Sequence, residues 1–296
     1  MAGFGSLAAA LERRDHRDSR PVGVVHTGAL VGAVVAGGLL AETVSRNHFL
    51  RRTLLTATAG WVVLGGRSLE REALAISGQL LAGDLPAARQ QVTHLVGRDT
   101  AAMDTADITR ATVESIAENT ADAVVSPLLF GAVAGIPGLL GYRAINTLDA
   151  MIGHRSPRYE RFGWAAARLD DVANFLPARV CVALIALSAP SVGSSARAAL
   201  TAATRDGRRH PSPNAGPVEA AFAGALGRTL GGVNVYGGVI EDRGTLGVGP
   251  RPEAADIARV ARLSTVVSAA ATLLAATIAS AAAAVVAAVS PGRRRS

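Results

Sequence analysis

The chain has 296 residues, of which 49% are hydrophobic and only 18% are charged. All 30 basic residues are arginines, which excludes a Walker-type phosphate loop, a pyridoxal Schiff base and a lysine adenylate, because each of these needs a lysine. The formal net charge of +7 is accompanied by only 4% aromatic residues, so we expect no nucleic-acid partner.

The distribution of apolar residues predicts an all-α, polytopic integral membrane protein. Residues 263–292 carry no charge before the closing arginines, and a helix of that length spans the about 30 Å of hydrocarbon in a bilayer. Further uncharged runs cover 21–41, 123–142 and 180–196, whereas 53–66 is so short that its flanking arginines would have to snorkel. Arginines beside these runs are typical of cytoplasmic flanks. An alanine-rich soluble helical bundle is the alternative.

The polar stretches of the first third predict helices at the membrane surface. Residues 1–20 are charged and are interpreted as a surface helix or a frayed tail. Apolar residues recur every three or four positions over 68–98, which predicts a helical hairpin on the membrane face. The turn of this hairpin lies at Gly83–Pro86, where Asp84 is a candidate N-cap for the second helix.

The apolar run at 124–142 is difficult to interpret as one straight helix. It follows a helix expected over 105–122, opened by Thr105 or Asp107, and it contains two prolines and four glycines. A single crossing would also put the polar motifs before and after the run on opposite sides of the membrane. We therefore expect a broken or re-entrant pair of half-helices, whose irregular backbone is satisfied by protein or water.

Helices are expected to resume at 143–151 and 164–176, the second of them ended by Pro177. The stretch 205–252 is rich in glycine and proline and is interpreted as mostly loop, apart from a helix near 217–229. The whole chain is interpreted as one membrane-embedded domain, 1–296. Its parts are a polar segment 1–20, amphipathic helices 68–122, motif helices 143–176, a polar loop 201–262 and a last span 263–290.

Three acidic side chains share one face of the helix that precedes the apolar run. Glu114, Glu118 and Asp122 are spaced four residues apart, with Asn119 beside them. Stacked like charges destabilise a helix unless a cation neutralises them, and Mg²⁺ is usually held by one or two carboxylates together with substrate phosphates. A solvated acidic face is the alternative.

Two further polar clusters follow the apolar run. They consist of Arg143, Asn146 and Asp149, and of Arg168, Asp170, Asp171 and Asn174. With the acidic face they offer carboxylates for a metal and arginines for anions, which suits the handling of phosphate. Each cluster alone is also consistent with a structural set of ion pairs. Arg158 lies in a loop between them, where it either grips an anionic group or belongs to a solvated charge run.

A proline-rich loop, His210–Gly216, contains Asn214 and precedes the helix that carries Glu219. The main-chain amides at the start of that helix would make an anion site. The glycine-rich stretch Gly231–Gly238 is more typical of a turn than of a phosphate cradle.

These motifs resemble the adenosylcobinamide-phosphate synthase family of cobalamin biosynthesis, also called CobD/CbiB. The matching runs are VGRDT (96–100), ESIAENTADAVVSPL (114–128), GYRAINTLDAMIG (141–153), RYERFGWAAARLDDVANFLPAR (158–179) and SPNAGPVEAAFAGALGRTLGG (212–232). They follow one another in the family's order, which is more specific than any single motif.

The resemblance implies a multi-pass enzyme of the cytoplasmic membrane whose active site faces the cytoplasm. It would join (R)-1-aminopropan-2-ol, or its O-phosphate, to the propionate carboxyl of adenosylcobyric acid, with ATP as co-substrate and Mg²⁺ as cofactor. Its partners would be the corrinoid, the aminoalcohol phosphate, membrane lipid and other enzymes of the cobalamin pathway. Family members commonly begin with a further apolar segment, so we expect this sequence to start after it; they also often have lysine where Arg143 stands.

Amide formation needs an activated carboxylate, most simply an acyl phosphate, with metal ligands, arginines for phosphate and a base for the ammonium. By charge and spacing, the metal ligands would be Glu118, Asp122 and Asp149. Phosphate groups would be bound by Arg143, Arg158 and Arg168, and substrate would be oriented by Asn119, Asn146, Asn174 and Asn214. Glu114 or Asp171 would take the amine proton.

Three other functions remain open. A transporter would bury ionisable groups inside its spans, whereas the polar clusters here lie at the ends of uncharged runs. A phospho-alcohol transferase would be expected to carry an aspartate-rich repeat in one helix, which the sequence lacks. A non-catalytic scaffold for corrinoid enzymes is the third alternative.

Overall fold

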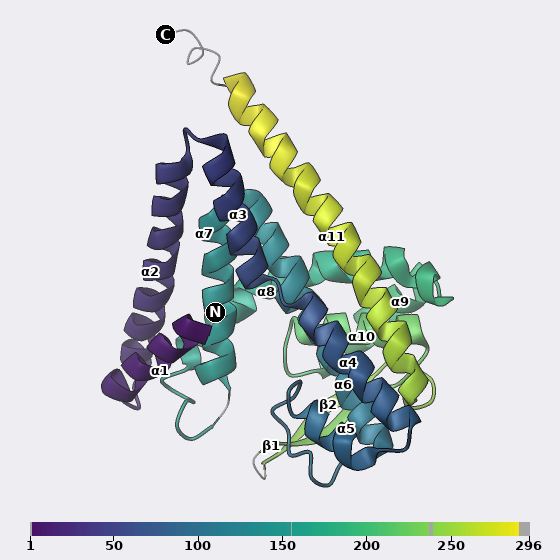
Figure 1. Cartoon of the computed structure of the whole chain (residues 1–296). Coiled ribbons are helices and arrows are strands. Elements are labelled where there is room, and N and C mark those ends of the chain that lie inside the picture. Colours follow the sequence, from purple (N-terminus) through teal and green to yellow (C-terminus); the bar gives the residue numbers. More distant parts are fainter. Residues whose placement is uncertain (1, 155, 237–238, 290–296) are drawn as a thin grey trace. The chain divides into compact units, whose positions relative to one another are not determined.

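The computed structural model describes residues 2–154, 156–236 and 239–289, and most of them are helical (Figure 1). This confirms the predicted helical class, with one small two-stranded sheet in addition. The chain forms two compact units built from segments far apart in the sequence. The first comprises Met1–Leu64, Ser126–Ala173 and Ala271–Ser296, and the second comprises Gly65–Val125 and Asn174–Ala270. The single membrane-embedded domain expected from the sequence stays a prediction.

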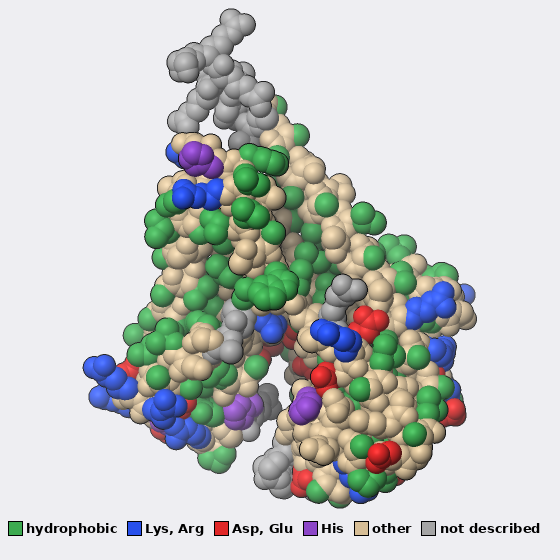
Figure 2. All heavy atoms as spheres, viewed as in Figure 1, with side chains coloured by type: hydrophobic (Ala, Val, Ile, Leu, Met, Phe, Trp, Pro, Cys, Tyr) green, Lys and Arg blue, Asp and Glu red, His purple; other side chains and the backbone are tan. Residues whose placement is uncertain are grey.

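Three N-terminal helices begin the first unit: α1 (Ala2–Asp15), α2 (Arg20–Ser45) and α3 (Phe49–Val63). α1 is the surface helix expected at the start of the chain. Along α2 and α3 the exposed side chains include many valines and leucines, and arginines flank both ends of the pair. In Figure 2 hydrophobic side chains cover the middle of these helices and basic ones gather at the two ends. For α2 this is the distribution of a membrane-crossing helix.

α7 (Ser126–Leu148) is two half-helices that meet at Gly135, whose φ of 60° and ψ of −141° are not helical. The half-helices fold back on each other. The rings of Phe130 and Tyr142 stack with their centroids 5.2 Å apart, whereas twelve residues of straight helix would separate them by about 18 Å. A Cβ at Gly138 would lie 2.2 Å from the Phe130 carbonyl oxygen, so this approach requires glycine. The expected break of this run into two half-helices is thus confirmed, and its re-entrant path in the membrane stays a prediction.

The break in α7 is stabilised by an acidic side chain of α2. Glu42 Oε1 accepts a hydrogen bond from the backbone amide of Ile136 at 3.0 Å, directly after the break. This satisfies an amide that the break removes from the helical ladder, as irregular backbone at membrane depth requires. The first unit also contains a π-helical turn, η2 (Asp149–Gly153), and the beginning of α8 (Trp164–Ser188).

The second unit begins with α4 (Gly66–Leu81) and α5 (Leu85–Val92), which form the helical hairpin predicted from the sequence. Asp84 caps α5 as expected, because its side chain accepts from the Ala87 amide at 3.0 Å. The other helical elements are α6 (Thr105–Thr120), η1 (Ala121–Val125), the remainder of α8, η3 (Ala189–Val192), α9 (Ala196–Asp206), η4 (Gly207–Arg209), α10 (Ala215–Leu226) and the start of α11 (Ala254–Val289).

Of two expected helix boundaries, one is confirmed and one is wrong. α6 begins at Thr105, as expected, and its N-cap is Asp104, whose side chain accepts from the Asp107 amide at 2.8 Å. α8 does not end at Pro177 but continues to Ser188. A proline removes one helical hydrogen bond, but ending the helix in apolar surroundings would leave several backbone groups unpaired, which costs more.

An antiparallel β-hairpin occupies part of the region that was expected to be mostly loop, so that expectation is wrong there. β1 (Leu230–Tyr236) pairs with β2 (Val239–Leu246), and the buried Leu230 lies opposite the buried Leu246. The register is irregular after Gly231, which has a φ of 80°. A bulge of this kind needs glycine, and glycine within a strand makes the sequence resemble a loop. Gly237 and Gly238 lie outside the described residues.

Four helical stretches among the described residues are long and apolar enough to cross a membrane. They are Arg20–Ser45, Thr105–Gly153, Trp164–Val192 and Ala254–Val285. They correspond to four of the uncharged runs in the sequence, whereas the shorter run at 53–66 lies in the 15-residue α3 and its following turn. Residue 290, the end of the expected last span, and residues 291–292 of the uncharged run lie outside the described residues. The protein is a multi-pass membrane protein by the length and composition of these helices.

Candidate functional site

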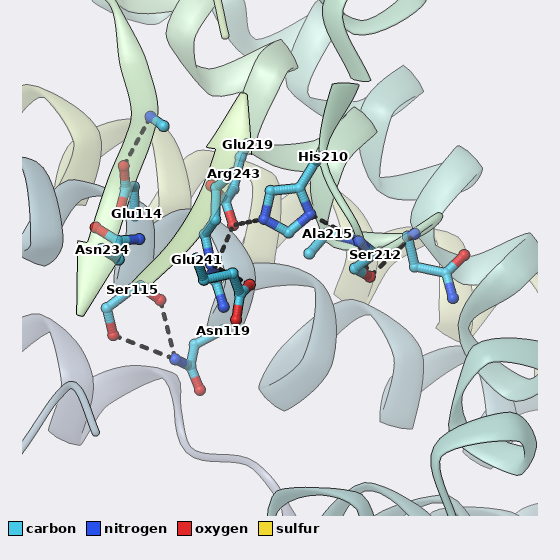
Figure 3. Close-up of polar contacts among 12 residues, drawn as sticks. Glu114, Ser115, Asn119, His210, Ser212, Ala215, Glu219, Asn234, Glu241 and Arg243 are labelled. Atoms are coloured by element: carbon cyan, nitrogen blue, oxygen red, sulfur yellow. Dashed lines mark hydrogen bonds and ion pairs between the residues drawn. The ribbon is translucent and has the colours of Figure 1, made fainter. Parts of the chain in front are cut away.

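Charged and polar side chains from α6, α10, the β-hairpin and the loops before the two helices gather in the second unit, where most of them are buried and the rest half-buried (Figure 3). Because the hairpin packs against both helices, it brings residues more than 100 positions apart into contact. We call this group the hairpin cluster, and it consists of Arg98, Arg110, Glu114, His210, Glu219, Asn234 and Arg243. Its members are spread along the sequence of the second unit, so no short stretch of sequence contains the site.

At one side of the hairpin cluster, both carboxylate oxygens of Glu114 accept hydrogen bonds. Its Oε2 accepts from Arg98 at 2.5 Å, and its Oε1 accepts from the Gly231 amide at 2.8 Å and from Arg110 at 3.4 Å. The side chains of Glu114 and Arg98 are 1% and 4% exposed. Both arginines also donate to Asn234 Oδ1, at 3.0 and 2.9 Å. A buried ion pair needs such extra hydrogen bonds, and here they attach β1 to α6.

Glu219 lies at the other side of the hairpin cluster and is fully buried on α10. Neither of its carboxylate oxygens has a hydrogen-bond partner among the described residues. His210 Nε2 and Arg243 Nη1 approach one oxygen, at 3.8 and 3.9 Å (Figure 3). Burial, and then the negative charges of Glu114 and Glu118, raise the pKa of Glu219 well above its usual 4.5. Burial therefore favours the protonated carboxyl group over the carboxylate at this position.

His210 is fixed by the loop in front of α10. Its Nδ1 accepts from the Ser212 amide at 3.0 Å, so the neutral imidazole carries its proton on Nε2, the nitrogen that faces Glu219. Burial, and then the charge of Arg243, lower the pKa of His210 to about 4. Glu219 and His210 are thus both shifted toward their uncharged forms.

The residues predicted from the sequence to form the site are divided between the two units. The second unit contains Glu114, Glu118, Asn119, Asp122, Asn174 and Asn214, and the first contains Arg143, Asn146, Asp149, Arg158, Arg168 and Asp171. The convergence of both sets on a single pocket therefore stays a prediction.

Within the second unit, three predicted asparagines have defined surroundings. Asn119 donates to the Ser115 carbonyl at 2.9 Å, and Asn174 is buried. Asn214 Oδ1 accepts from Arg179 at 2.7 Å.

The anion site expected on the main-chain amides at the start of α10 is wrong. The Ala215 amide donates to Ser212 Oγ at 3.1 Å, and the Gly216 amide donates to the Ser212 carbonyl at 3.3 Å. Pro217 has no amide hydrogen. The first turn of α10 is therefore capped by Ser212, which leaves these donors committed.

Within the first unit, the predicted arginines are bound to neighbouring polar groups. Arg143 donates to Asn146 at 3.1 Å, and Arg168 pairs with Asp171 at 3.3 Å. Arg158 forms an ion pair with Glu12 of α1 at 2.7 Å, a partner that the sequence did not indicate. Burial alone would raise the pKa of Glu12, but the hydrogen bond and charge of Arg158 outweigh it and lower the pKa.

Magnesium is compatible with two of the predicted ligands. Among the described residues no three His, Cys, Asp or Glu side chains gather as a ready-made metal site. A magnesium ion usually needs only one or two protein carboxylates beside substrate phosphates. Glu118, at the end of α6, and Asp122, in η1, lie on successive turns and fit that requirement. Asp149 lies in η2 of the other unit, and its role stays a prediction.

Sequence reasoning missed most of the hairpin cluster, although two signals were present. Arg98 and Glu219 lie inside runs that match the family motifs, and Arg110 precedes Glu114 by four residues, the spacing of a helical ion pair. Asn234 and Arg243 lie in strands that were not expected, so no pattern indicated them.

Comparison with known proteins agrees with the motifs. A family model described as "CobD/Cbib protein" matches residues 1–264. A Mycobacterium tuberculosis protein named "Cobalamin biosynthesis protein CobD" is 53% identical over 274 residues, which cover 92% of this chain and 87% of that protein. Proteins of the same name from Geobacter metallireducens and Rhodobacter capsulatus are 46% and 43% identical, over 75% and 86% of this chain and 68% and 81% of their own. No solved structure matches. The chain belongs to the CobD/CbiB family of cobalamin biosynthesis.

Proposed function

We propose that this protein is the ligase that joins (R)-1-aminopropan-2-ol O-phosphate to the propionate carboxyl of adenosylcobyric acid, with ATP as co-substrate. Its family supports a place in cobalamin biosynthesis. The observation that carries the proposal of amide formation is Glu219, a fully buried carboxyl group without a hydrogen-bond partner among the described residues, beside one imidazole and one guanidinium group. Burying such a group is costly, and sites of proton transfer are where this arrangement is useful.

The proposed reaction has two steps. The propionate carboxylate attacks the γ-phosphorus of ATP, which gives an acyl phosphate and ADP. The amine nitrogen then attacks the acyl carbon, the carbon–oxygen bond to phosphate breaks, and inorganic phosphate leaves while the ammonium loses a proton. Negative charge develops on the acyl oxygen and on phosphate, where arginines stabilise it. A carboxylate whose pKa is raised is a stronger base than an ordinary one, so in its ionised form it accepts the proton more readily.

In this proposal Glu219 exchanges the amine proton, and Arg243 stabilises the charge that develops beside it. Glu114 is committed to Arg98, Arg110 and Gly231, which supports a positioning role; its role as proton acceptor, and that of Asp171, stay predictions. The sequence-based proposals for the remaining groups are unchanged. Phosphate groups are bound by Arg143, Arg158 and Arg168, substrate is oriented by Asn119, Asn146, Asn174 and Asn214, and magnesium is held by Glu118, Asp122 and Asp149.

Magnesium, when bound, would neutralise charge on the triphosphate. Because ATP is a cytoplasmic metabolite, we place the site at the cytoplasmic face of the cell membrane. Association with other enzymes of the pathway is part of the same proposal.

Rescue of a strain that lacks the synthase tests the proposal. Expression of this chain, with and without added aminopropanol phosphate, should restore cobamide production. The Glu219→Gln variant should reach the membrane in equal amount but fail to rescue. A matched control is Glu253→Gln, since the Glu253 side chain is 73% exposed and lies outside the hairpin cluster. If the wild-type chain accumulates in the membrane without restoring cobamides, the proposal is wrong, and a transport or scaffold function is favoured.

A further inference from the structure

A separate pocket of about 430 Å³ lies in the second unit, beside the hairpin cluster. It is lined by the second half of α8, the end of α9, η4 and the proline-rich loop before α10. Its polar lining comes from Arg179, Thr204, Arg208 and His210, and its walls include Pro211 and Pro217. We call it the arginine pocket. His210 belongs to both the pocket and the hairpin cluster.

Among the described residues no acidic side chain lines the arginine pocket, so the charged side chains in its lining, Arg179 and Arg208, are positive. Arg208 is exposed and forms neither an ion pair nor a side-chain hydrogen bond within the part of the chain that the structure describes. Its neighbours differ: Arg205 and Arg209 both pair with the buried Asp206, at 2.5 and 3.3 Å. Of the three arginines near the end of α9, Arg208 is therefore the one whose charge is left for a ligand.

Arg179 adds a second positive charge, fixed in direction. It donates to Asn214 Oδ1 at 2.7 Å and to the Phe175 carbonyl at 3.0 Å, and its guanidinium lies 3.9 Å from the centroid of the Phe175 ring. These partners are neutral, so they orient the guanidinium without cancelling its charge. Arg179 also belongs to a helix apolar enough to cross a membrane. An arginine in such a helix is costly and usually marks a functional site.

The wall of the arginine pocket is held rigidly. Gly207 packs so tightly against Pro217 that a Cβ on the glycine would lie 2.8 Å from the proline Cα. Ser212 caps the first turn of α10 and donates its amide to His210, which fixes the loop. Such preorganisation reduces the entropy lost when a ligand binds.

We infer that the arginine pocket binds a phosphate monoester, and that in the proposed reaction it holds the phosphate of the aminoalcohol. This assignment rests on the proposed function. Two guanidinium groups match the charge and the acceptor oxygens of a phosphate dianion. A nucleoside triphosphate would be accompanied by magnesium, which usually binds one or two carboxylates, and none of the described residues that line the pocket supplies one. In the aminoalcohol phosphate only two carbon atoms separate the ester oxygen from the amine. His210 connects the pocket to Glu219, the proposed acceptor of the amine proton.

Kinetics with paired substrates test the inference. For Arg208→Gln and Arg179→Gln, the KM for aminopropanol phosphate should rise about tenfold or more, since each variant removes a charge-assisted contact. The KM values for unphosphorylated aminopropanol and for ATP should not change. Arg197→Gln is a matched control, because Arg197 is an exposed arginine of α9 that does not line the arginine pocket. Melting temperatures establish whether each variant is folded. Because Arg208 is exposed, we expect Arg208→Gln to melt at the wild-type temperature.

Direct binding separates this inference from the proposed function. Titration of the purified protein in detergent with aminopropanol phosphate, followed by ³¹P NMR, should show binding that the double Arg179→Gln, Arg208→Gln variant loses. Binding without amide synthesis would refute the proposed function and keep the phosphate pocket. Synthesis with unchanged KM values in the variants would refute the pocket.

The remaining outcomes also decide the assignment. If only the KM for ATP rises in the variants, the pocket binds the nucleotide. If the KM values for aminopropanol and its phosphate rise equally, the pocket does not recognise phosphate. If vesicles of phosphatidylglycerol, but not of phosphatidylcholine, abolish the ³¹P NMR binding, the phosphate recognised is that of a lipid headgroup. Each of these results would overturn the assignment to the substrate.

Discussion

Replacing Glu114 with alanine tests whether its buried carboxylate attaches the β-hairpin to α6. The Arg98 side chain is only 4% exposed, and the substitution removes the carboxylate with which it pairs. Removing one partner of a buried ion pair costs about 3–5 kcal/mol, which corresponds to a fall in melting temperature of about 6–20 °C for a chain of this size. The assay is reaction of a thiol-specific dye on heating, because Cys181, the only cysteine, is buried in the second unit and reports on its unfolding.

Two further variants check the physical reason for that loss. Combining Glu114→Ala with Arg98→Met should restore part of the stability, since no unpaired buried cation then remains. Glu118→Ala, one turn later on α6 and only half-buried, should change the melting temperature by no more than about 2 °C. If Glu114→Ala melts within about 2 °C of the wild type, the proposed attachment is wrong. Lost activity at unchanged stability would instead support the amine-base role predicted from the sequence.

Three other substitutions probe the fold and its pH dependence. Gly135→Ala should sharply reduce the folded fraction on size-exclusion chromatography, because its φ is 60° and a Cβ would lie 1.9 Å from Glu42 Oε1; Gly32→Ala, in open space, should not. The folded state keeps a proton on Glu219 that the unfolded state releases above its usual pKa of 4.5, so wild-type stability should fall as pH rises from there through the folded pKa. Glu219→Gln should remove this decline in dye melting curves, and an unchanged slope would contradict the raised pKa. The hydrogen bond from Arg205 lowers the pKa of Asp206 below 3.8, so Asp206→Asn should destabilise the protein at neutral pH, with a difference that shrinks as the pH falls through the folded pKa.

Much of the helical framework could be predicted because its signals are local. The residues around Asp84 form a pattern typical of the start of a helix, and Asp84 does cap α5. The glycines and prolines around Gly135 indicated the break in α7. The β-hairpin could not be predicted, since a strand interrupted by a bulge at Gly231 has the composition of a loop. The helix end expected at Pro177 was wrong because a local signal was overridden. The preference of proline to end a helix is outweighed by the apolar surroundings of α8.

The candidate site shows the same division between local and tertiary information. Glu114 could be placed on the correct helix, and its i−4 partner Arg110 follows from helical spacing. Its contacts with Arg98 and Gly231 depend on how the hairpin packs, and they are invisible to any sequence window. Glu219 stands among alanines, so no cluster of polar residues along the chain pointed to it.

Amide synthesis by the purified protein is the most direct test of the proposed activity. The protein in detergent is supplied with adenosylcobyric acid, aminopropanol phosphate, ATP and Mg²⁺, and the corrinoid is analysed by mass spectrometry. We expect adenosylcobinamide phosphate, with one inorganic phosphate released for each amide formed and no product when ATP is omitted. A folded preparation that leaves adenosylcobyric acid unchanged, or that forms the amide without consuming ATP, would contradict the proposed ligase.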